Sequence, residues 1–217
     1  MPHTLCLPTR LLAVLFAVVA FVGCSQFADS HPEQPIDYSH NQHVIDNEIP
    51  CMYCHQTVDR SAVATVPSVE TCMNCHEFIA TDSEEIMKVA DYWNRHEPIP
   101  WNKVHDQPDF VHFTHERHVK YFMSCFTETE PDDWAACKLA DVESSPIDPH
   151  ENMEFAAQAE TCAQCHGPVW EMTTAERVVP FNMGWCVDCH REAIDRAPEE
   201  EKPLVQARIM DCYTCHK

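Results

Sequence analysis

The sequence predicts a mostly α-helical and irregular fold, in which short helices and long loops leave little or no β structure. Apolar residues recur at helical spacing in several segments, whereas no stretch shows the alternation of a convincing strand. The chain has 3 glycines but 16 prolines, and proline-rich connections are extended and rigid rather than flexible. The third observation is a pentapeptide, Cys-x-x-Cys-His, which occurs five times.

Four segments are expected to be helical. They are residues 81–96, 132–143, 151–160 and 202–216. In the first, Thr81 and Glu84 have the spacing of a capping box, and prolines follow the segment. In the last, Val205, Ile209 and Cys212 share one face, and a proline near the start suits a first helical turn.

The five pentapeptides, called the first to fifth motifs in chain order, predict the chemistry. Their cysteines are Cys51 and Cys54, Cys72 and Cys75, Cys162 and Cys165, Cys186 and Cys189, and Cys212 and Cys215, and their histidines are His55, His76, His166, His190 and His216. Residues three and four apart share one face of a helical turn. Both thiols can therefore bond to one porphyrin while the histidine binds its iron, as in c-type haem attachment. The motifs predict five covalently bound haem c groups.

Structural zinc is the main alternative to haem, because paired Cys-x-x-Cys units also bind zinc. Zinc does not require a histidine directly after each pair, yet all five pairs have one. Thioredoxin-like redox pairs are disfavoured further, because no βαβ pattern surrounds any motif. Haem attachment is therefore the interpretation that explains the whole pattern.

Five haems determine how the chain is expected to fold. They leave roughly 40 residues per cofactor, which is too little protein to build a separate core around each one. The porphyrins are therefore expected to form a stack that supplies much of the apolar interior, with the helices and loops wrapped around it. On this view residues 38–217 form one pentahaem domain of the cytochrome c type.

The amino terminus predicts export from the cytoplasm. Residues 1–24 carry one arginine, then an apolar run that ends at Cys24, and they resemble a secretory signal with a lipoprotein box. Cleavage there would leave Cys24 as a lipidated amino terminus. Alternatively, the uncharged residues 11–28 remain as a transmembrane anchor of marginal length. Either way, residues 25–37 act as a linker, and the haem domain lies on the periplasmic side, tethered to the membrane.

Charge limits the classes of partner. Thirty-five acidic residues against 14 basic ones give a formal net charge of −21. Binding to nucleic acid and adsorption on anionic lipid are therefore disfavoured. The acidic surface is explained equally well by docking of a basic electron carrier and by solubility alone.

Histidines outside the motifs are candidates for the sixth, distal ligand that a low-spin haem iron needs. His40 and His43 precede the first motif as YSHNQH, and His115 and His118 repeat the arrangement as FTHERH, which indicates an internal duplication. Solvated surface histidines are the alternative for each pair. For the fifth iron we favour His105. Further candidates are His112, His96, His150, Met172 and Met183. If every iron has six ligands, the chain conducts electrons and has no open site for a substrate.

Several longer stretches resemble the pentahaem cytochrome subunit of alternative complex III, a quinol-oxidising respiratory complex. They are YSHNQHVIDNEIPCMYCHQTVDRS, PSVETCMNCHEFI, PIPWNKVHDQPDFVHFTHERHV, CAQCHGPVWEM, NMGWCVDCHRE and DCYTCHK. The paired histidines also resemble the haem cores of the cytochrome c3 and c7 families. The resemblance implies an electron-transport subunit with an iron–sulfur and molybdopterin-like subunit, NrfD-like quinone-binding membrane subunits and a monohaem cytochrome c as partners. It also supports His40, His43, His105, His115 and His118 as axial ligands.

One departure from this family is an insert at about residues 126–160. In the family the second histidine pair is followed closely by its motif, whereas here the third motif begins only at Cys162. The insert carries Cys137, which can form a disulfide with Cys125 in an oxidising compartment. Free thiols and unusual ligand roles are the alternatives for this pair.

Three other functions are weighed against the electron-transfer subunit. A NapC- or NrfH-like quinol dehydrogenase would contact quinol itself, and it is favoured if residues 11–28 stay as an anchor. A multihaem reductase needs an open haem, often with a lysine in place of a motif histidine, but all five motifs here end in histidine. A free periplasmic shuttle conflicts with the expected membrane tether.

Overall fold

The computed structural model describes residues 31–139 and 142–216, and the part from His31 onward forms one compact unit. Its helices are α2 (Cys51–Cys54), α3 (Val69–His76), α4 (Glu84–Arg95), α5 (His115–Glu128), α6 (Met153–His166), α7 (Met183–Arg196), α8 (Lys202–Ile209) and α9 (Cys212–Cys215), joined by η1 (Gln42–Asp46), η2 (Pro131–Cys137) and η3 (Val169–Glu171). Within the described ranges the extended segments form no strand, and one antiparallel bridge joins Val111 to His216. The mostly helical and irregular fold is therefore confirmed.

The expectations for the amino terminus lie outside the residues that the structure describes. They concern the signal segment of residues 1–24, the alternative anchor at 11–28 and Cys24. Among the helices of the described residues, none combines the length and the apolar character that crossing a bilayer requires.

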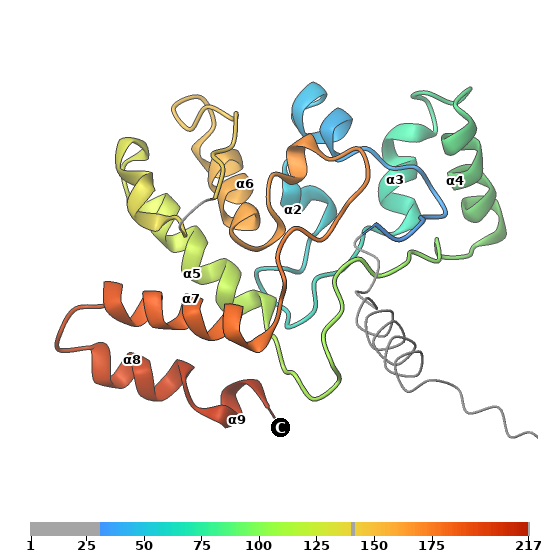
Figure 1. The fold of residues 1–217 in the computed structure, drawn as a ribbon. Coiled ribbons are helices and arrows are strands. Elements are labelled where there is room, and N and C mark those ends of the chain that lie inside the picture. Colours follow the sequence, from blue (N-terminus) through green and yellow to red (C-terminus); the bar gives the residue numbers. More distant parts are fainter. Residues whose placement is uncertain (1–30, 140–141, 217) are drawn as a thin grey trace, which may run out of the picture. The chain divides into compact units, whose positions relative to one another are not determined.

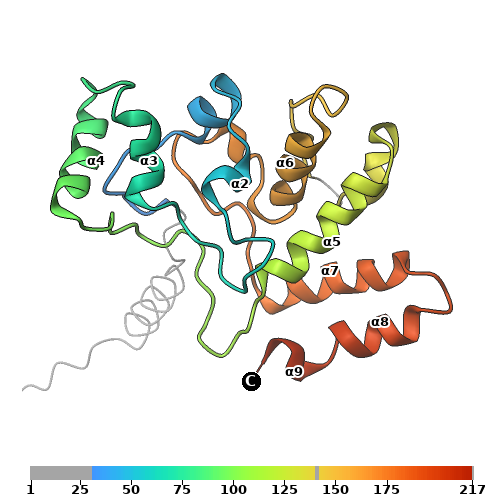
Figure 2. The same cartoon turned by 180° about the vertical axis from the view of Figure 1, so that it is seen from behind.

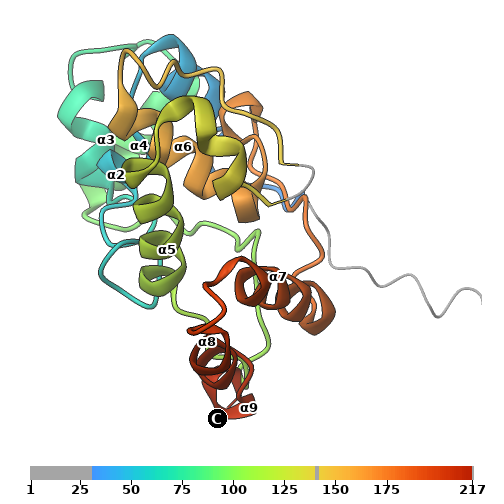
Figure 3. The same ribbon diagram turned by 90° about the vertical axis from the view of Figure 1, so that its left-hand side faces the viewer.

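The helices pack in neighbouring pairs. Figure 1 shows α3 beside α4, α5 beside α6, and α7 running back along α8, and each pair is in contact. The reverse view in Figure 2 shows the same three pairs. In Figure 3 the short helix α9 follows α8 at the carboxyl end of the chain, below α7. The chain thus forms three helical hairpin-like units, with α2 packed against α6.

Two of the expected helices differ in detail from the sequence prediction. Helix α4 begins after Ser83, whose side chain makes no capping hydrogen bond. The predicted capping box is wrong, because Glu84 is the first residue of the helix rather than its third. Residues 202–216 form α8 and α9 rather than one helix, since Asp211 accepts a hydrogen bond from the Tyr213 N–H (2.8 Å) and starts a new turn. The continuous apolar face predicted there is therefore interrupted.

The other two expected helices also change their limits. The described residues of 132–139 form the 3₁₀ segment η2 as far as Cys137, and Lys138 after it is extended, so the helix expected at 132–143 is wrong there. The helix predicted at 151–160 extends through the third motif as α6, capped by Asn152, whose side chain accepts from the Phe155 N–H at 3.1 Å. Helices α5 and α7 were not among the four expected segments.

Three small apolar clusters hold the described residues together. One joins α5, η2 and α6, another packs the middle of α6 on η1 and η3, and the third lies between α3 and α4. Their buried members are Phe122, Phe126, Trp134, Cys137, Ala156 and Ala157; Val44, Phe155, Ala159, Ala163 and Trp170; and Ile36, Val69, Val89 and Ile99. Helices α2, α7, α8 and α9 contribute no buried residue. The protein therefore covers these four helices, three of which carry motif cysteines, only partly.

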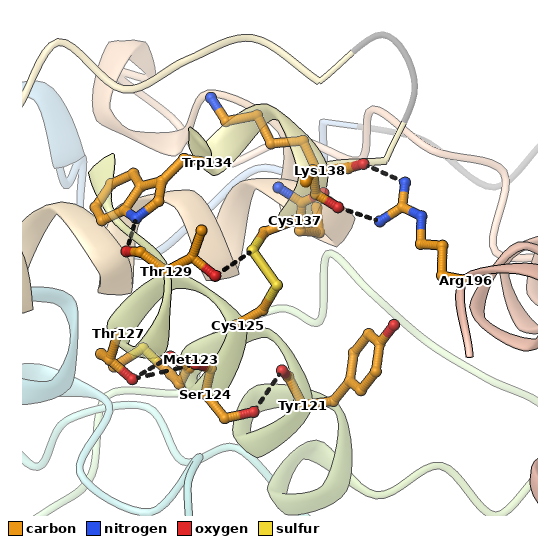
Figure 4. Close-up of a disulfide and its surroundings, with 12 residues drawn as sticks. Tyr121, Met123, Ser124, Cys125, Thr127, Thr129, Trp134, Cys137, Lys138 and Arg196 are labelled. Carbon is orange, nitrogen blue, oxygen red and sulfur yellow. Dashed lines mark hydrogen bonds between the residues drawn. A yellow bond between two sulfur atoms is a disulfide. The ribbon is translucent and has the colours of Figure 1, made fainter. Parts of the chain in front are cut away.

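The insert forms the first of these clusters rather than a solvated loop. Cys125 at the end of α5 and Cys137 at the end of η2 form a disulfide with a Cα–Cα distance of 5.7 Å, as expected from the sequence. Figure 4 shows the Trp134 indole N–H donating to the Thr129 carbonyl (3.1 Å) and Arg196 of α7 donating to carbonyls on either side of Cys137. The insert is thus tied both to α5 and to the helix of the fourth motif.

The loop of the insert also contacts the buried polar face of α6. Gln164, which is 1% exposed, accepts from the Leu139 N–H at 2.7 Å, and Glu160 accepts from the Ser145 N–H at 2.8 Å. Lys138 places its Nζ 2.8 Å from Glu160 Oε2. The bonds from Leu139 and Ser145 satisfy side-chain oxygens of Gln164 and Glu160 that would otherwise be buried without partners.

Candidate functional site

Each of the five motifs lies on a helix. The first and fifth form the single-turn helices α2 and α9, the second and third form the last turns of α3 and α6, and the fourth lies in the middle of α7. Side chains of Ser68, Asn152, Asn182 and Asp211 cap four of these helices at their amino ends. All ten motif cysteines are free thiols. The local structure that haem attachment requires is therefore present at each motif.

Backbone carbonyls fix the rings of three motif histidines. Nδ1 of His55 lies 2.8 Å from the carbonyl oxygen of Thr65. Nδ1 of His76 lies 3.0 Å from the carbonyl oxygen of Ile79, and Nδ1 of His190 lies 2.8 Å from that of Ile209. A carbonyl only accepts, so Nδ1 carries the proton in each ring. The other nitrogen, Nε2, is then unprotonated and available to a metal, which is the usual arrangement around ligating histidines.

Two distal candidates face motif histidines from other parts of the chain. The ring centroids of His43 and His76 lie 6.0 Å apart, and those of His118 and His190 lie 6.1 Å apart. An iron bound to two imidazole nitrogens at about 2 Å from each separates the ring centroids by about 6 Å. Both pairs therefore have the separation that one shared iron requires.

The two histidine pairs of the duplication have the same local geometry. The ring of Tyr38 stacks on His43 at 4.5 Å and meets His40 edge-on at 4.9 Å. In the second copy, Phe113 stacks on His118 at 4.4 Å and meets His115 edge-on at 4.8 Å. His43 and His118 also place Nδ1 2.8 Å from the carbonyl oxygen four residues earlier, in Ser39 and Thr114. The internal duplication predicted from the sequence is thus visible as a repeated structure.

Five further histidines gather near the contact between the two copies. They are His40, His55, His105, His115 and His166. Burial is the main cause that lowers the pKa of His166 to about 3, and the charge of the neighbouring His105 is the second. Burial also lowers the pKa of His40 to about 4, with His55 as the second cause. Both rings are therefore neutral at pH 7, which is the form that binds a metal.

His105 contacts His166 directly. The Nε2 atom of His105 lies 3.4 Å from Nδ1 of His166, and the ring centroids are 4.5 Å apart. This separation is too small for an iron between the rings. The geometry alone therefore does not assign His105 to the iron of the third motif.

The fifth motif lies beside residues 110–112. The ring of His216 lies 5.9 Å from Phe110, and the N–H of His112 donates to the Cys215 carbonyl at 2.8 Å. Between the described residues, no ring contact joins His216 to any of the five favoured distal histidines. Val111 and His216 are opposite in an antiparallel bridge, so their side chains share a face and that of His112 points to the other.

The motif thiols lie on separate helices. Among the described residues, no group of three or more histidine, cysteine, aspartate or glutamate side chains is placed to hold one metal ion. A structural zinc site needs four such ligands converging on one point. The motif thiols are distributed over five helices instead, as attachment to separate porphyrins requires.

No protein-family model matches the chain. A curated relative, the multihaem cytochrome c subunit of menaquinone reductase from Nitratidesulfovibrio vulgaris (strain Hildenborough), is 30% identical over 165 residues. The match covers 72% of this chain and 77% of the relative. This chain belongs to the multihaem c-type cytochromes. Covalently bound haem c and a role in electron transfer follow from that membership.

The residues of this cytochrome fit the group that its family binds. Motif thiols stand free, motif histidines are oriented by carbonyls, and two distal histidines lie across from them at iron-binding separation. Helices α7 and α9 lack buried residues, so their apolar side chains are available to contact porphyrin. The match between these features and haem c is therefore both chemical and geometric.

The remaining distal candidates of the cytochrome lie apart from the motif histidines. His96 is exposed at the end of α4, and His150 is exposed with Nε2 3.8 Å from Asp132. Met183, at the start of α7, is 68% exposed, whereas Met172 is buried and its carbonyl accepts from the Asn41 N–H at 3.2 Å. None of these four residues makes a ring contact with a motif histidine in the described part of the chain.

Sequence reasoning missed two kinds of functional residue in the cytochrome. Tyr38 and Phe113 hold the paired histidines in place, and both precede the first histidine by two positions. Alignment of the two copies of the duplication would have identified them. The carbonyls that orient the motif histidines leave no sequence signal, because any residue type supplies a carbonyl.

Proposed function

We propose that this cytochrome carries five haems and passes electrons from a quinol-oxidising membrane complex towards a soluble or terminal acceptor. The observation that supports this most directly is the repeated pairing of His43 with His76 and His118 with His190 at centroid distances of 6.0 and 6.1 Å. Bound haem supplies a reversible one-electron iron couple whose potential depends on its axial ligands and surroundings. Two imidazoles on one iron leave no position for a substrate, which favours electron transfer over catalysis.

We infer a role for each group of side chains. In each motif the two cysteines bond to the porphyrin and the histidine provides the proximal ligand. His43 serves the second motif and His118 the fourth, while His40 and His115 serve the first and third. His105, the first choice from the sequence, serves the fifth. The apolar clusters of α3 with α4 and of α5 with α6 hold these ligands in place and keep water away from one side of each site.

The proposed partners follow from the resemblance to alternative complex III and from the relative's name. They are an iron–sulfur and molybdopterin-like subunit, NrfD-like quinone-binding membrane subunits and a monohaem cytochrome c. The relative is a subunit of a menaquinone reductase, which supports association with a quinone-linked complex. The net charge of −21 suits docking to a partner with a basic surface.

A second candidate function has the opposite direction of electron flow. The relative's name describes reduction of menaquinone, whereas the family resemblance implies oxidation of quinol. The same ligands and motifs serve either direction, because each iron couple is reversible. The direction is measured by mixing the membrane-extracted complex with a menaquinol analogue and, separately, pre-reduced complex with the matching quinone.

We also propose that the cytochrome is held on the periplasmic side of the membrane. Covalent haem attachment to such motifs takes place outside the cytoplasmic membrane, and residues 1–24 have the composition of a signal ending in a lipoprotein box. If Cys24 carries lipid, Cys24→Ala releases the protein from membranes. If residues 11–28 form an anchor instead, the variant stays in the membrane fraction.

The deciding experiment is electron paramagnetic resonance of the membrane-extracted holoprotein, combined with its haem-to-protein ratio and the identity of co-purifying proteins. Five low-spin haems together with large membrane subunits are expected. A high-spin haem whose signal shifts on addition of nitrite would overturn the proposal in favour of a reductase. Recovery with lipid and quinol but without partner subunits would favour a NapC- or NrfH-like quinol dehydrogenase, and recovery as a soluble protein would favour a shuttle.

A further inference from the structure

The first and second motifs are neighbours within the first copy of the duplication. His43 faces His76 of the second motif, and its carbonyl accepts from the Ile49 N–H at 3.0 Å, just before the first motif begins. The turn that carries His43 therefore joins the second motif to the residues that lead into the first.

The first and third motifs are joined across the two copies. The N–H of Met52 in the first motif donates to the side chain of Gln158 in α6, at 3.0 Å, and α2 packs on α6. The first motif, on α2, therefore lies against the helix that ends in the third motif.

A row of aromatic rings leads from the third motif to the fourth. The ring of His166 lies 6.2 Å from Phe181, and Phe181 lies 5.2 Å from Trp185, the residue before the fourth motif. The third and fourth motifs are thus adjacent, as the first and second are.

The fifth motif follows the fourth. Nδ1 of His190 lies 2.8 Å from the carbonyl oxygen of Ile209, at the end of the helix that leads into the fifth motif, and α7 packs on α8. Within the described residues, no hydrogen bond or ring contact joins the second motif to the third, fourth or fifth. The contacts therefore form a row without branches.

We propose that electrons pass along the motifs in the order second, first, third, fourth, fifth, so that they enter and leave this chain at the second and fifth motifs. This order rests on the proposed function, because it assumes one haem at each motif. Each transfer oxidises one iron from Fe(II) to Fe(III) and reduces its neighbour from Fe(III) to Fe(II), without forming or breaking a bond. The electrons come from quinol at one end and go to an acceptor protein at the other.

The order differs from the order of the motifs in the sequence, and the duplication explains why. The first and third motifs come first in their copies, and they lie side by side through the Met52 N–H and Gln158 of α6. The second and fourth motifs come next in their copies, and their histidines, His76 and His190, face the distal histidines His43 and His118. The fifth motif has no counterpart in the first copy, so it extends the row at one end only.

The test uses matched ligand variants of the holoprotein, His43→Met and His118→Met. Replacing one imidazole by a thioether raises the potential of that haem, so it stays reduced while its neighbours are titrated. A reduced neighbour carries one positive charge less, which stabilises the oxidised form next to it and lowers its midpoint potential. We expect His43→Met to lower one other midpoint potential and His118→Met to lower two. His150→Met, at an exposed histidine outside the motifs, should change none.

Equal numbers of affected haems in the two variants, or two affected haems in His43→Met, would overturn the order.

Haem content is measured first by mass spectrometry, since a count other than five would contradict the proposed function rather than the order. If either variant loses a haem, the unmodified holoprotein is titrated instead, with the haem methyl signals followed by nuclear magnetic resonance. Four pairwise redox interactions that link five haems in a row support the order, and a ring or star of interactions contradicts it.

Discussion

The imidazole of His118 lies opposite that of His190, with ring centroids 6.1 Å apart and planes inclined by only 19°. The two residues come from different helices, α5 and α7, that are separated by more than 50 positions in the chain. Carbonyl oxygens of Thr114 and Ile209 lie 2.8 Å from the two Nδ1 atoms, so Nε2 of each ring is unprotonated and available to a metal. His43 and His76 have a similar centroid distance, 6.0 Å, but their planes are inclined by 66°.

Removal of either distal histidine should affect one iron only. We expect His118→Ala to convert one haem from low to high spin, because His118 is the imidazole that faces His190 among the described residues, while the covalent haem content stays unchanged. His43→Ala should do the same for the second motif. The spin states are measured by electron paramagnetic resonance and by the visible spectrum of the oxidised protein. His150→Ala is the control, and an unchanged low-spin count in His118→Ala would remove that residue from the ligands.

His105 and His112 are competing candidates for the distal ligand of the iron at the fifth motif. The backbone of His112 contacts the fifth motif, yet the alternation of side chains around the Val111–His216 bridge points its ring away from His216. We therefore expect His105→Ala to produce one high-spin haem and His112→Ala to produce none. The opposite result, measured by the same spectra, would assign the fifth iron to His112.

Haem chemistry was predictable because it is encoded locally. Five residues in a fixed order form each motif, and the paired histidines at 40 and 43 recur at 115 and 118, so both patterns are visible without knowledge of the fold. The pairing of His43 with His76 was not predictable. It depends on a contact between the ring of His43, in η1, and the ring of His76, at the end of α3, and these two residues are far apart in the sequence.

Helices α5 and α7 were missed for a related reason. Both carry histidines or motif cysteines where an ordinary helix has the apolar residues of its buried face, and α7 buries none of its residues against protein. The histidines and cysteines were therefore interpreted as haem-binding residues, and the helices around them were not predicted, although α5 buries Phe122 and Phe126. The role of the insert in the core was not foreseen. Phe126 and Trp134 pack there against α6, and neither stands in a distinctive sequence pattern.

The disulfide in the insert should stabilise the protein without affecting haem attachment. Cys125 and Cys137 are separated by 12 positions, and cross-linking a loop near this length stabilises a protein by about 3 kcal/mol in the chain-entropy model. We expect Cys125→Ala/Cys137→Ala to lower the free energy of unfolding by roughly this amount. Urea unfolding of the holoprotein, followed by circular dichroism, measures it. The haem content should remain that of the unmodified protein, and a loss of haem would mean that the pair also supports the motifs.

Breaking the ion pair between Lys138 and Glu160 should cost more stability than breaking any surface pair. Its side chains are only 14% and 4% exposed, with Nζ 2.8 Å from Oε2. Removing one partner of a buried pair leaves an unpaired charge and costs about 3–5 kcal/mol. We expect a loss of this size for Lys138→Met, because the Glu160 carboxylate then remains buried without its partner. Lys120→Met is the matched control, since Lys120 and Glu116 are 61% and 39% exposed and such pairs contribute at most about 1 kcal/mol.

A double-mutant cycle separates this pair from its surroundings. Glu160→Gln keeps an oxygen for the Ser145 N–H, which the carboxylate accepts at 2.8 Å, and removes only the charge. Lys138→Met/Glu160→Gln should therefore be more stable than Lys138→Met alone, because no buried charge is left unpaired. Urea unfolding of the four proteins gives the interaction free energy. If the two single losses simply add in the double variant, Lys138 and Glu160 do not interact energetically, and the loop of the insert is held by the hydrogen bonds to Gln164 and Ser145 instead.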